Sequence, residues 1–212
     1  RIAVGPPLDP KYHRVKALLA EQSGELDRAE QAWLAFIEDL QENPTLDARE
    51  RSIAIALVYQ HLGGGLTVLA RGKGEYGPLP SPWDDADDEG DYQELVDRAM
   101  GYFERSLEHA PALRETYLMY LASLKELNQS PRKTRHVYGR LLEQFPDDLE
   151  VLLAAAHYYL EEDDPATAKK YAQAAYRLQP RDERVLTMIW RAALTTARLA
   201  ARRREFGVAR AE

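Results

Sequence analysis

A repeated segment in the second half of the chain restricts the possible folds most strongly. Residues 115–148 and 149–182 have the same length and align without a gap. Four pairs of aligned positions are small, aromatic, aliphatic or proline: Thr134 and Ala168, Tyr138 and Ala172, Leu141 and Ala175, Pro146 and Pro180. A period of about 34 residues is typical of stacked helical hairpins, in which small residues lie where helices cross closely. The repeat therefore predicts an all-α array of helix pairs.

The same period divides the rest of the chain. The boundaries are an N-terminal arm and helix start at residues 1–12, repeats at 13–46, 47–114, 115–148 and 149–182, and a last segment at 183–212. In this last segment we predict an extended helix to about Arg204, followed by the start of a truncated further repeat from Phe206. Because the chain begins with Arg1 instead of methionine, we expect that it was cut from a longer protein.

The repeat at 47–114 is interrupted. Its first helix is predicted to stop at Gly63-Gly64-Gly65, since glycine is unfavourable in a helix interior. A second helix resumes at Asp91, which forms a capping box with Glu94. We therefore predict one hairpin with an insertion at 63–90. Two degenerate repeats over the same span are the alternative.

These residues resemble the tetratricopeptide repeat family over most of residues 13–182. The family's usual glycine at the eighth position is replaced by alanine in four repeats, at Ala20, Ala54, Ala122 and Ala156. The resemblance implies a right-handed superhelix of antiparallel helix pairs, whose concave groove binds a peptide or protein partner. It also implies an adaptor or scaffold and not an enzyme. Residues 135–146 resemble the half-a-tetratricopeptide repeat of RNA-processing scaffolds, which gives an alternative function.

The resemblance also implies which residues line the groove. In the family these are fixed positions on the first helix of each hairpin. Here they are Arg51, Ile55, Val58, Met119, Ser123, Leu153, His157, Thr187 and Arg191. An apolar floor with an arginine towards each end would suit an apolar or acidic peptide segment, because a guanidinium can bind a carboxylate through two hydrogen bonds. The alternative is that some of these residues pack against neighbouring helices.

The insertion is a second candidate site. It contains Arg71, Lys73, Tyr76 and Trp83, and many acidic residues follow them. A long loop in a compact domain is often functional, so a partner-binding loop and a solvated linker are both open interpretations. A phosphate-loop motif and a calcium loop both fail on spacing, and we expect neither a metal nor a cofactor.

The composition of the chain argues against several classes of function. The formal net charge of −7 argues against nonspecific nucleic-acid binding, because that depends on excess Lys and Arg. No cysteine is present, so thiolate metal sites and a Cys nucleophile are excluded. No long apolar run predicts membrane insertion, and the cytoplasm is favoured. Two further hypotheses are self-association through the array ends, which would give a homo-oligomer, and an accessory domain of an enzyme.

Overall fold

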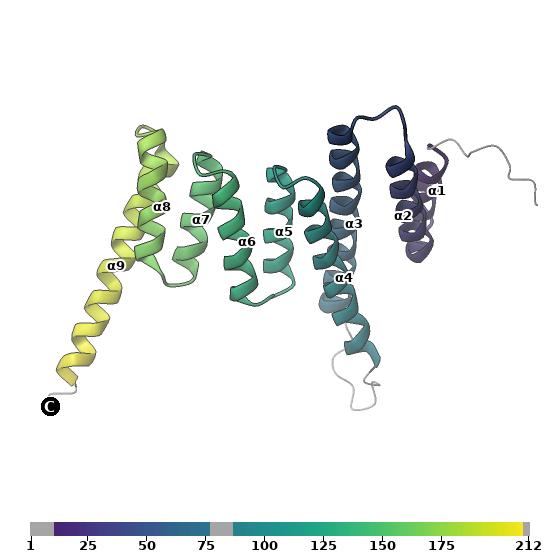
Figure 1. Ribbon diagram of the computed structural model, residues 1–212. Coiled ribbons are helices and arrows are strands. Elements are labelled where there is room, and N and C mark those ends of the chain that lie inside the picture. The colour runs from purple at the N-terminus through teal and green to yellow at the C-terminus, as the bar shows by residue number, and fades with distance from the viewer. Residues whose placement is uncertain (1–10, 77–86, 210–212) are drawn as a thin grey trace, which may run out of the picture. The chain divides into compact units, whose positions relative to one another are not determined.

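The computed structural model describes residues 11–76 and 87–209, and every regular element in these ranges is a helix. The helices are α1 (Lys11–Gln22), α2 (Leu26–Glu42), α3 (Ala48–Tyr76), α4 (Asp87–His109), α5 (Arg114–Glu126), α6 (Pro131–Gln144), α7 (Leu149–Glu161), α8 (Pro165–Leu178) and α9 (Glu183–Ala209) (Figure 1). The predicted all-α class is confirmed. The chain divides into two compact units, residues 1–137 and 138–212, and each is considered by itself.

Three of the hairpins turn in the same way. In each, the second residue after the first helix has a positive φ: Gly24 (73°), Asn128 (49°) and Asp163 (54°). The following N–H donates to a carbonyl five residues earlier, from Glu25 to Ala20, from Gln129 to Leu124 and from Asp164 to Tyr159, at 2.9, 2.8 and 2.8 Å. This is the Schellman arrangement that satisfies the last carbonyls of a helix. Glycine, Asn and Asp are the residues that tolerate this conformation best.

Replacing Asp163 by glycine should stabilise the fold. The left-handed conformation of Asp163 costs an L-residue about 1 kcal/mol that glycine avoids. The free energy of unfolding in urea should therefore rise by roughly 0.5–1 kcal/mol. Asp147→Gly is the matched control, because this exposed turn residue has no positive φ and should give a small loss. A loss at both positions would mean that the turn at Asp163 carries no backbone strain.

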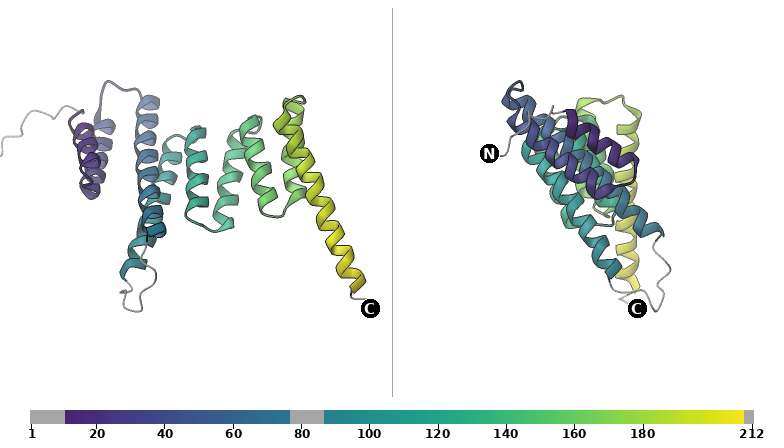
Figure 2. Two further views of the ribbon diagram at one scale, coloured as in Figure 1. Left: turned by 180° about the vertical axis from the view of Figure 1, so that it is seen from behind. Right: turned by 90° about the vertical axis from the view of Figure 1, so that its right-hand side faces the viewer.

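In unit 1, α3 and α4 run side by side over their length (Figures 1 and 2). The prediction that Gly63-Gly64-Gly65 ends the first helix is wrong, because α3 continues to Tyr76. Close packing explains two of the three glycines: a Cβ on Gly63 would lie 3.1 Å from the buried ring of Phe103 in α4. A Cβ on Gly64 would lie 3.1 Å from Met119 Cε in α5.

The predicted insertion is therefore largely helical. Its first part, to Tyr76, extends α3, and α4 begins at Asp87, four residues before the predicted start at Asp91. Residues 77–86, which include Trp83, lie outside the described residues. The span 47–114 thus folds as one hairpin with two long helices.

Polar contacts join α3 to its neighbours inside this core. The buried hydroxyl of Ser106 donates to the Ala56 carbonyl oxygen at 2.8 Å. The hydroxyl of Thr67 donates to the hydroxyl of Ser123 at 3.0 Å. Since buried hydroxyls are costly unless they are paired, these bonds favour a single arrangement of α3 against α4 and α5.

One described helix, α3 over Ala48–Gly72, is long and apolar enough to cross a membrane by length and composition alone. The prediction that no run of the chain is long enough for this is therefore wrong. Within this stretch, 44% of the 18-residue apolar window is buried inside the protein, including Ile55, Leu62 and Ala70. Burial against α4 and α5 accounts for the apolar composition of the helix.

Unit 2 contains α7, α8 and α9 around a core of Leu152, Leu153, Ala156, Ala172, Ala175, Val185 and Met188. Aspartates cap two of these helices: Asp148 accepts from the N–H groups of Glu150 and Val151, and Asp164 accepts from that of Thr167. The predicted break before Phe206 is wrong, since α9 continues to Ala209. A single glycine in a helix, here Gly207, costs only about 1 kcal/mol and does not by itself end the helix.

Candidate partner-binding surfaces

Four of the predicted groove residues are packing residues instead. Ile55, Val58, Ser123 and Leu153 are each less than 9% exposed. Ile55 and Val58 lie on α3, which is packed against α2, α4 and α5, and Leu153 belongs to the core of unit 2. In the tetratricopeptide repeat family these positions of the first helix face an open groove, but here neighbouring helices cover them.

Arg51 of α3 binds the segment that connects α2 to its own helix. Its Nη2 donates to the carbonyl oxygens of Asn43 and Leu46, both at 3.0 Å. These carbonyls lie at the end of α2 and in the connection to α3, and the Arg51 side chain is half-buried there. The guanidinium therefore joins the two helices, a role that the family register did not predict.

The remaining predicted groove residues are accessible. Met119 is 38% exposed and accepts a hydrogen bond from Gln60 Nε2 at its sulfur. His157 is half-exposed in α7, 3.7 Å from Glu161. Thr187 and Arg191 are exposed in α9, where the structure brings them together.

Three of the four insertion residues lie in the last turns of α3. Arg71 forms an ion pair with Glu126 of α5 at 3.5 Å. Lys73 and Tyr76 follow it in the same helix. These residues therefore belong to a helix end and not to a loop.

Thr187 and Arg191 belong to an open surface on α9. The surface is an open hollow of about 480 Å³ lined by Glu183, Leu186, Thr187, Trp190, Arg191 and Leu194, which we call the α9 surface. Trp190 is 75% exposed, Leu194 is 51% exposed and Leu186 is 40% exposed. A tryptophan exposed to this extent between two exposed leucines is typical of an interaction site.

The α9 helix is apolar on two opposite sides. Val185, Met188 and Ala192 are buried against α7 and α8. Trp190 and Leu194 lie on the other side of the helix, at i and i+4. An exposed apolar stripe opposite the buried side of a helix is typical of a surface that binds a partner. The sequence contained this signal as the stripe Leu186, Trp190 and Leu194, but none of these residues was among the predicted site residues.

Basic side chains lie along one edge of the α9 surface. Arg191 and Arg198, seven residues apart, are exposed on the same side of the helix and form no ion pair among the described residues. Arg184, by contrast, is held by Asp182 at 2.9 Å and by Glu150 at 2.7 Å. The bonds from Arg184 lower the pKa of the Asp182 carboxyl group. The α9 surface therefore combines an apolar centre with a basic edge at Arg191, which Arg198 extends along the helix, and it carries one carboxylate, Glu183, at its N-terminal end.

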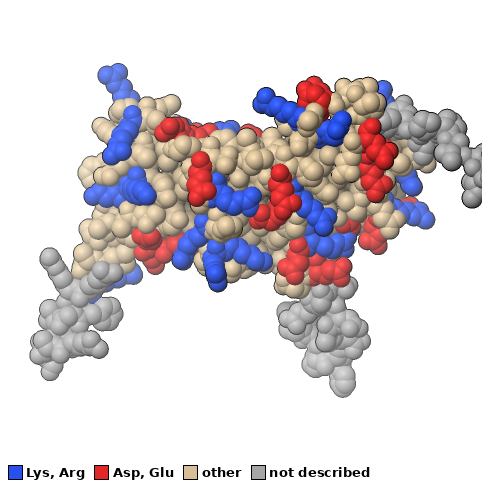
Figure 3. Space-filling view, viewed as in Figure 1, with Lys and Arg blue, Asp and Glu red and all other residues tan. Residues whose placement is uncertain are grey.

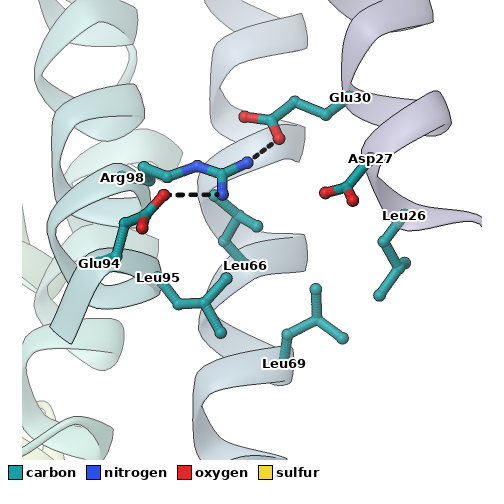
Figure 4. Close-up of a pocket in the computed structure, with 8 residues that line it drawn as sticks. All are labelled: Leu26, Asp27, Glu30, Leu66, Leu69, Glu94, Leu95 and Arg98. Carbon is teal, nitrogen blue, oxygen red and sulfur yellow. Dashed lines mark hydrogen bonds and ion pairs between the residues drawn. The ribbon is translucent and has the colours of Figure 1, made fainter. Parts of the chain in front are cut away.

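A second hollow, of about 270 Å³, lies in unit 1 between the start of α2 and the paired helices α3 and α4 (Figure 4). We call it the α2–α4 cleft. Its walls are Leu26, Asp27, Glu30, Leu66, Leu69, Glu94, Leu95 and Arg98. Arg98 forms ion pairs with Glu30 and, at 3.6 Å, with Glu94. The hydroxyl of Tyr102 also donates to Glu30, and burial raises the pKa of this phenol.

Charge elsewhere is mixed. On the face shown in Figure 3, acidic and basic side chains are interspersed. A continuous basic patch, which nucleic-acid binding requires, is not seen on that face. Among the described residues, no group of three His, Cys, Asp or Glu side chains is placed to hold a metal ion.

Successive antiparallel hairpins with buried small residues, such as Ala168, Ala172 and Ala175, define an all-α helical-repeat fold, the fold class that the resemblance to tetratricopeptide repeats predicted. No family model matches the chain, and no curated protein matches it.

Solved structures of low sequence identity are similar to this chain. A mutant of MamA is 15% identical with a TM-score of 0.42, over 90% of this chain and 88% of that chain. The P58(IPK) TPR domain is 14% identical with a TM-score of 0.38, over 89% and 66% of the two chains. The TPR2AB domain of yeast Sti1, in a complex with pHSP90, is 14% identical with a TM-score of 0.39, over 88% and 86%.

Proposed function

We propose that this chain is a protein–protein interaction module that binds a helical segment of a partner protein on the α9 surface. The observation that carries the proposal is the exposure of Trp190, 75%, between two exposed leucines on an open helix face. Thr187 and Arg191 are the members of the predicted groove that contribute to this surface. An amphipathic helix fits such a face by placing its apolar side along the stripe.

The charge of the surface selects the partner. Arg191 and Arg198 would attract a helix whose apolar side is bordered by Asp or Glu, and would repel one bordered by Lys. Two copies of the α9 surface are poorly matched to each other for the same reason. In an antiparallel pair of α9 helices centred near Ala192, Arg191 of one copy would lie close to Arg191 of the other. An acidic amphipathic helix is therefore the proposed occupant, in preference to a second copy.

Trp190→Glu should weaken binding of such a helix at least tenfold. The probe is a fluorescein-labelled synthetic helix of three heptads, with leucine on one side and glutamate along both borders. Loss of a central tryptophan costs about 2 kcal/mol or more at many interfaces, and the new carboxylate also repels the probe. Fluorescence anisotropy measures the dissociation constant. Val68→Glu is the control, because Val68 is an apolar residue of α3 that is 58% exposed.

A double variant tests whether the α9 surface prefers an acidic partner. Arg191→Glu combined with Arg198→Glu should reverse the preference, so that the protein binds the same probe with lysine borders more tightly than the one with glutamate borders. Circular dichroism should show an unchanged helix content, since all substituted side chains are exposed. Equal affinity of wild-type protein for both probes, or no effect of Trp190→Glu, would disprove the proposal.

A further inference from the structure

We propose that the α2–α4 cleft is a second binding site, which takes an arginine or lysine side chain of a partner together with an adjoining apolar residue. This inference goes beyond the proposed function. It concerns unit 1, a different set of residues and a ligand of opposite charge.

The long helices of the interrupted hairpin form two walls of the cleft. Leu66 and Leu69 lie in the part of α3 that follows the three glycines, and Leu95 and Arg98 lie near the start of α4. The third wall is the first turn of α2, beginning at Leu26. The segment that distinguishes this chain from a regular array of hairpins is therefore the segment that builds the site.

The interior of the cleft is apolar. Leu66 is 8% exposed and forms the floor, whereas Leu69 and Leu95 are half-buried and Leu26 is 43% exposed. Figure 4 shows the side chains of Leu66, Leu69 and Leu95 directed into the space between α2 and the α3–α4 pair. A space of about 270 Å³ bordered by leucines suits one long side chain with a methylene stem.

The border of the cleft is acidic. Three carboxylates, Asp27, Glu30 and Glu94, and a single guanidinium, that of Arg98, line the cleft. Glu30 is bound by both Arg98 and Tyr102. The Glu94 side chain, by contrast, is 68% exposed, and its ion pair with Arg98 is long, at 3.6 Å. Asp27 forms no hydrogen bond or ion pair in the part of the chain that the structure describes. Negative charge is thus in excess beside an apolar cavity.

Arg98 illustrates how a basic side chain fits here. Its guanidinium lies between Glu30 and Glu94, and its chain leaves α4 beside Leu95 (Figure 4). An incoming basic side chain can use Asp27, which is unpaired among the described residues, and Glu94, whose exposed carboxylate forms only a long ion pair with Arg98, while its stem covers Leu69 and Leu26. Charge-assisted hydrogen bonds of this kind are stronger than neutral ones.

The experiment uses a heptapeptide with one arginine between two leucines, set in glycine and serine, and the same peptide with citrulline in place of arginine. Titration of the ¹⁵N-labelled full chain should shift the amide signals of Asp27, Leu66, Leu69 and Arg98. Citrulline has the shape of arginine without the charge, and its peptide should bind several-fold more weakly. The loss should shrink as salt is raised, because exposed charges are screened.

Variants of the protein identify the carboxylate. Asp27→Asn should weaken binding of the arginine peptide roughly two- to fivefold, the range of an exposed ion pair, and Asp27→Lys should abolish it. Glu108→Gln is the matched control, because Glu108 is an exposed acidic residue of α4 outside the cleft. Equal binding of the citrulline peptide, signal changes away from the cleft, or unchanged binding by Asp27→Lys would each overturn the inference. Because the α9 variants leave this site intact, failure here leaves the proposed function untouched.

Discussion

Leucine at position 63 should strongly destabilise the fold, although leucine is a much better helix former than glycine. Gly63 is buried in α3, and even a Cβ there would lie 3.1 Å from three atoms of the Phe103 ring. Phe103 is 0% exposed, so its ring has no free space into which it can move. A full leucine side chain must therefore push α3 and α4 apart. Overpacking of this kind typically costs about 1–3 kcal/mol or more.

The matched control is two residues away on the same helix. Gly65 is exposed, and a Cβ there would meet nothing within 4 Å. Gly65→Leu should raise the free energy of unfolding by roughly 0.5–1 kcal/mol, the difference in helix propensity. Urea denaturation followed by circular dichroism measures both variants. Gains at both positions would show that Gly63 is not needed for close packing against Phe103.

These glycines illustrate where prediction from the sequence succeeded and where it did not. The period predicted the small residues at helix crossings, and Ala168, Ala172 and Ala175 are all 0% exposed. Intrinsic propensity predicted a helix end at Gly63, but packing against Phe103 and Met119 prevailed. A glycine that ends a helix and one that admits a neighbouring ring look alike in a single sequence, because the ring lies 40 residues away.

The candidate sites were less predictable for a related reason. The family register assigned one face of each first helix to the groove, yet it cannot tell how many neighbours that helix has. Ile55 and Val58 are covered because α3 packs against three helices, whereas Thr187 and Arg191 remain exposed. The cleft depends on the additional length of α3 and α4, which was interpreted as a loop. Neither surface follows from the repeat alone, since each lies where the repeat is irregular.

Tyr138 should make the stability of unit 2 fall steeply in alkali. Burial, together with the neighbouring Tyr158 and Glu161, raises the pKa of its phenol to about 12. Its ring stacks on that of Tyr158, with centroids 4.6 Å apart, and its hydroxyl donates to the Ala154 carbonyl oxygen at 3.4 Å. The folded protein therefore favours the neutral phenol, while the phenol of the unfolded chain ionises near its ordinary pKa of 10.0.

The direction of the change in stability with pH depends on whether the folded or the unfolded chain loses the Tyr138 proton first. Below pH 10 the phenol is neutral in both states, and its contribution to stability is fully present. As the pH rises from about 10 to about 12, the unfolded chain is deprotonated first, so unfolding becomes more favourable. The loss should be about 1.4 kcal/mol by pH 11 and approach about 2–3 kcal/mol above pH 12.

Tyr138→Phe isolates this contribution. The variant keeps the stacked ring and loses only a long hydrogen bond, so its free energy of unfolding at pH 7 should lie within about 1 kcal/mol of wild type. Between about pH 9 and 11, however, the difference should shift in favour of the variant by more than about 1 kcal/mol. Tyr176→Phe serves as the control, because Tyr176 is 42% exposed and should retain the wild-type pH dependence. Urea unfolding at about pH 7, 9, 10 and 11 gives both curves. If wild type and Tyr138→Phe lose stability in parallel, the Tyr138 hydroxyl is in water and its ring packs less closely on Tyr158 than the structure describes.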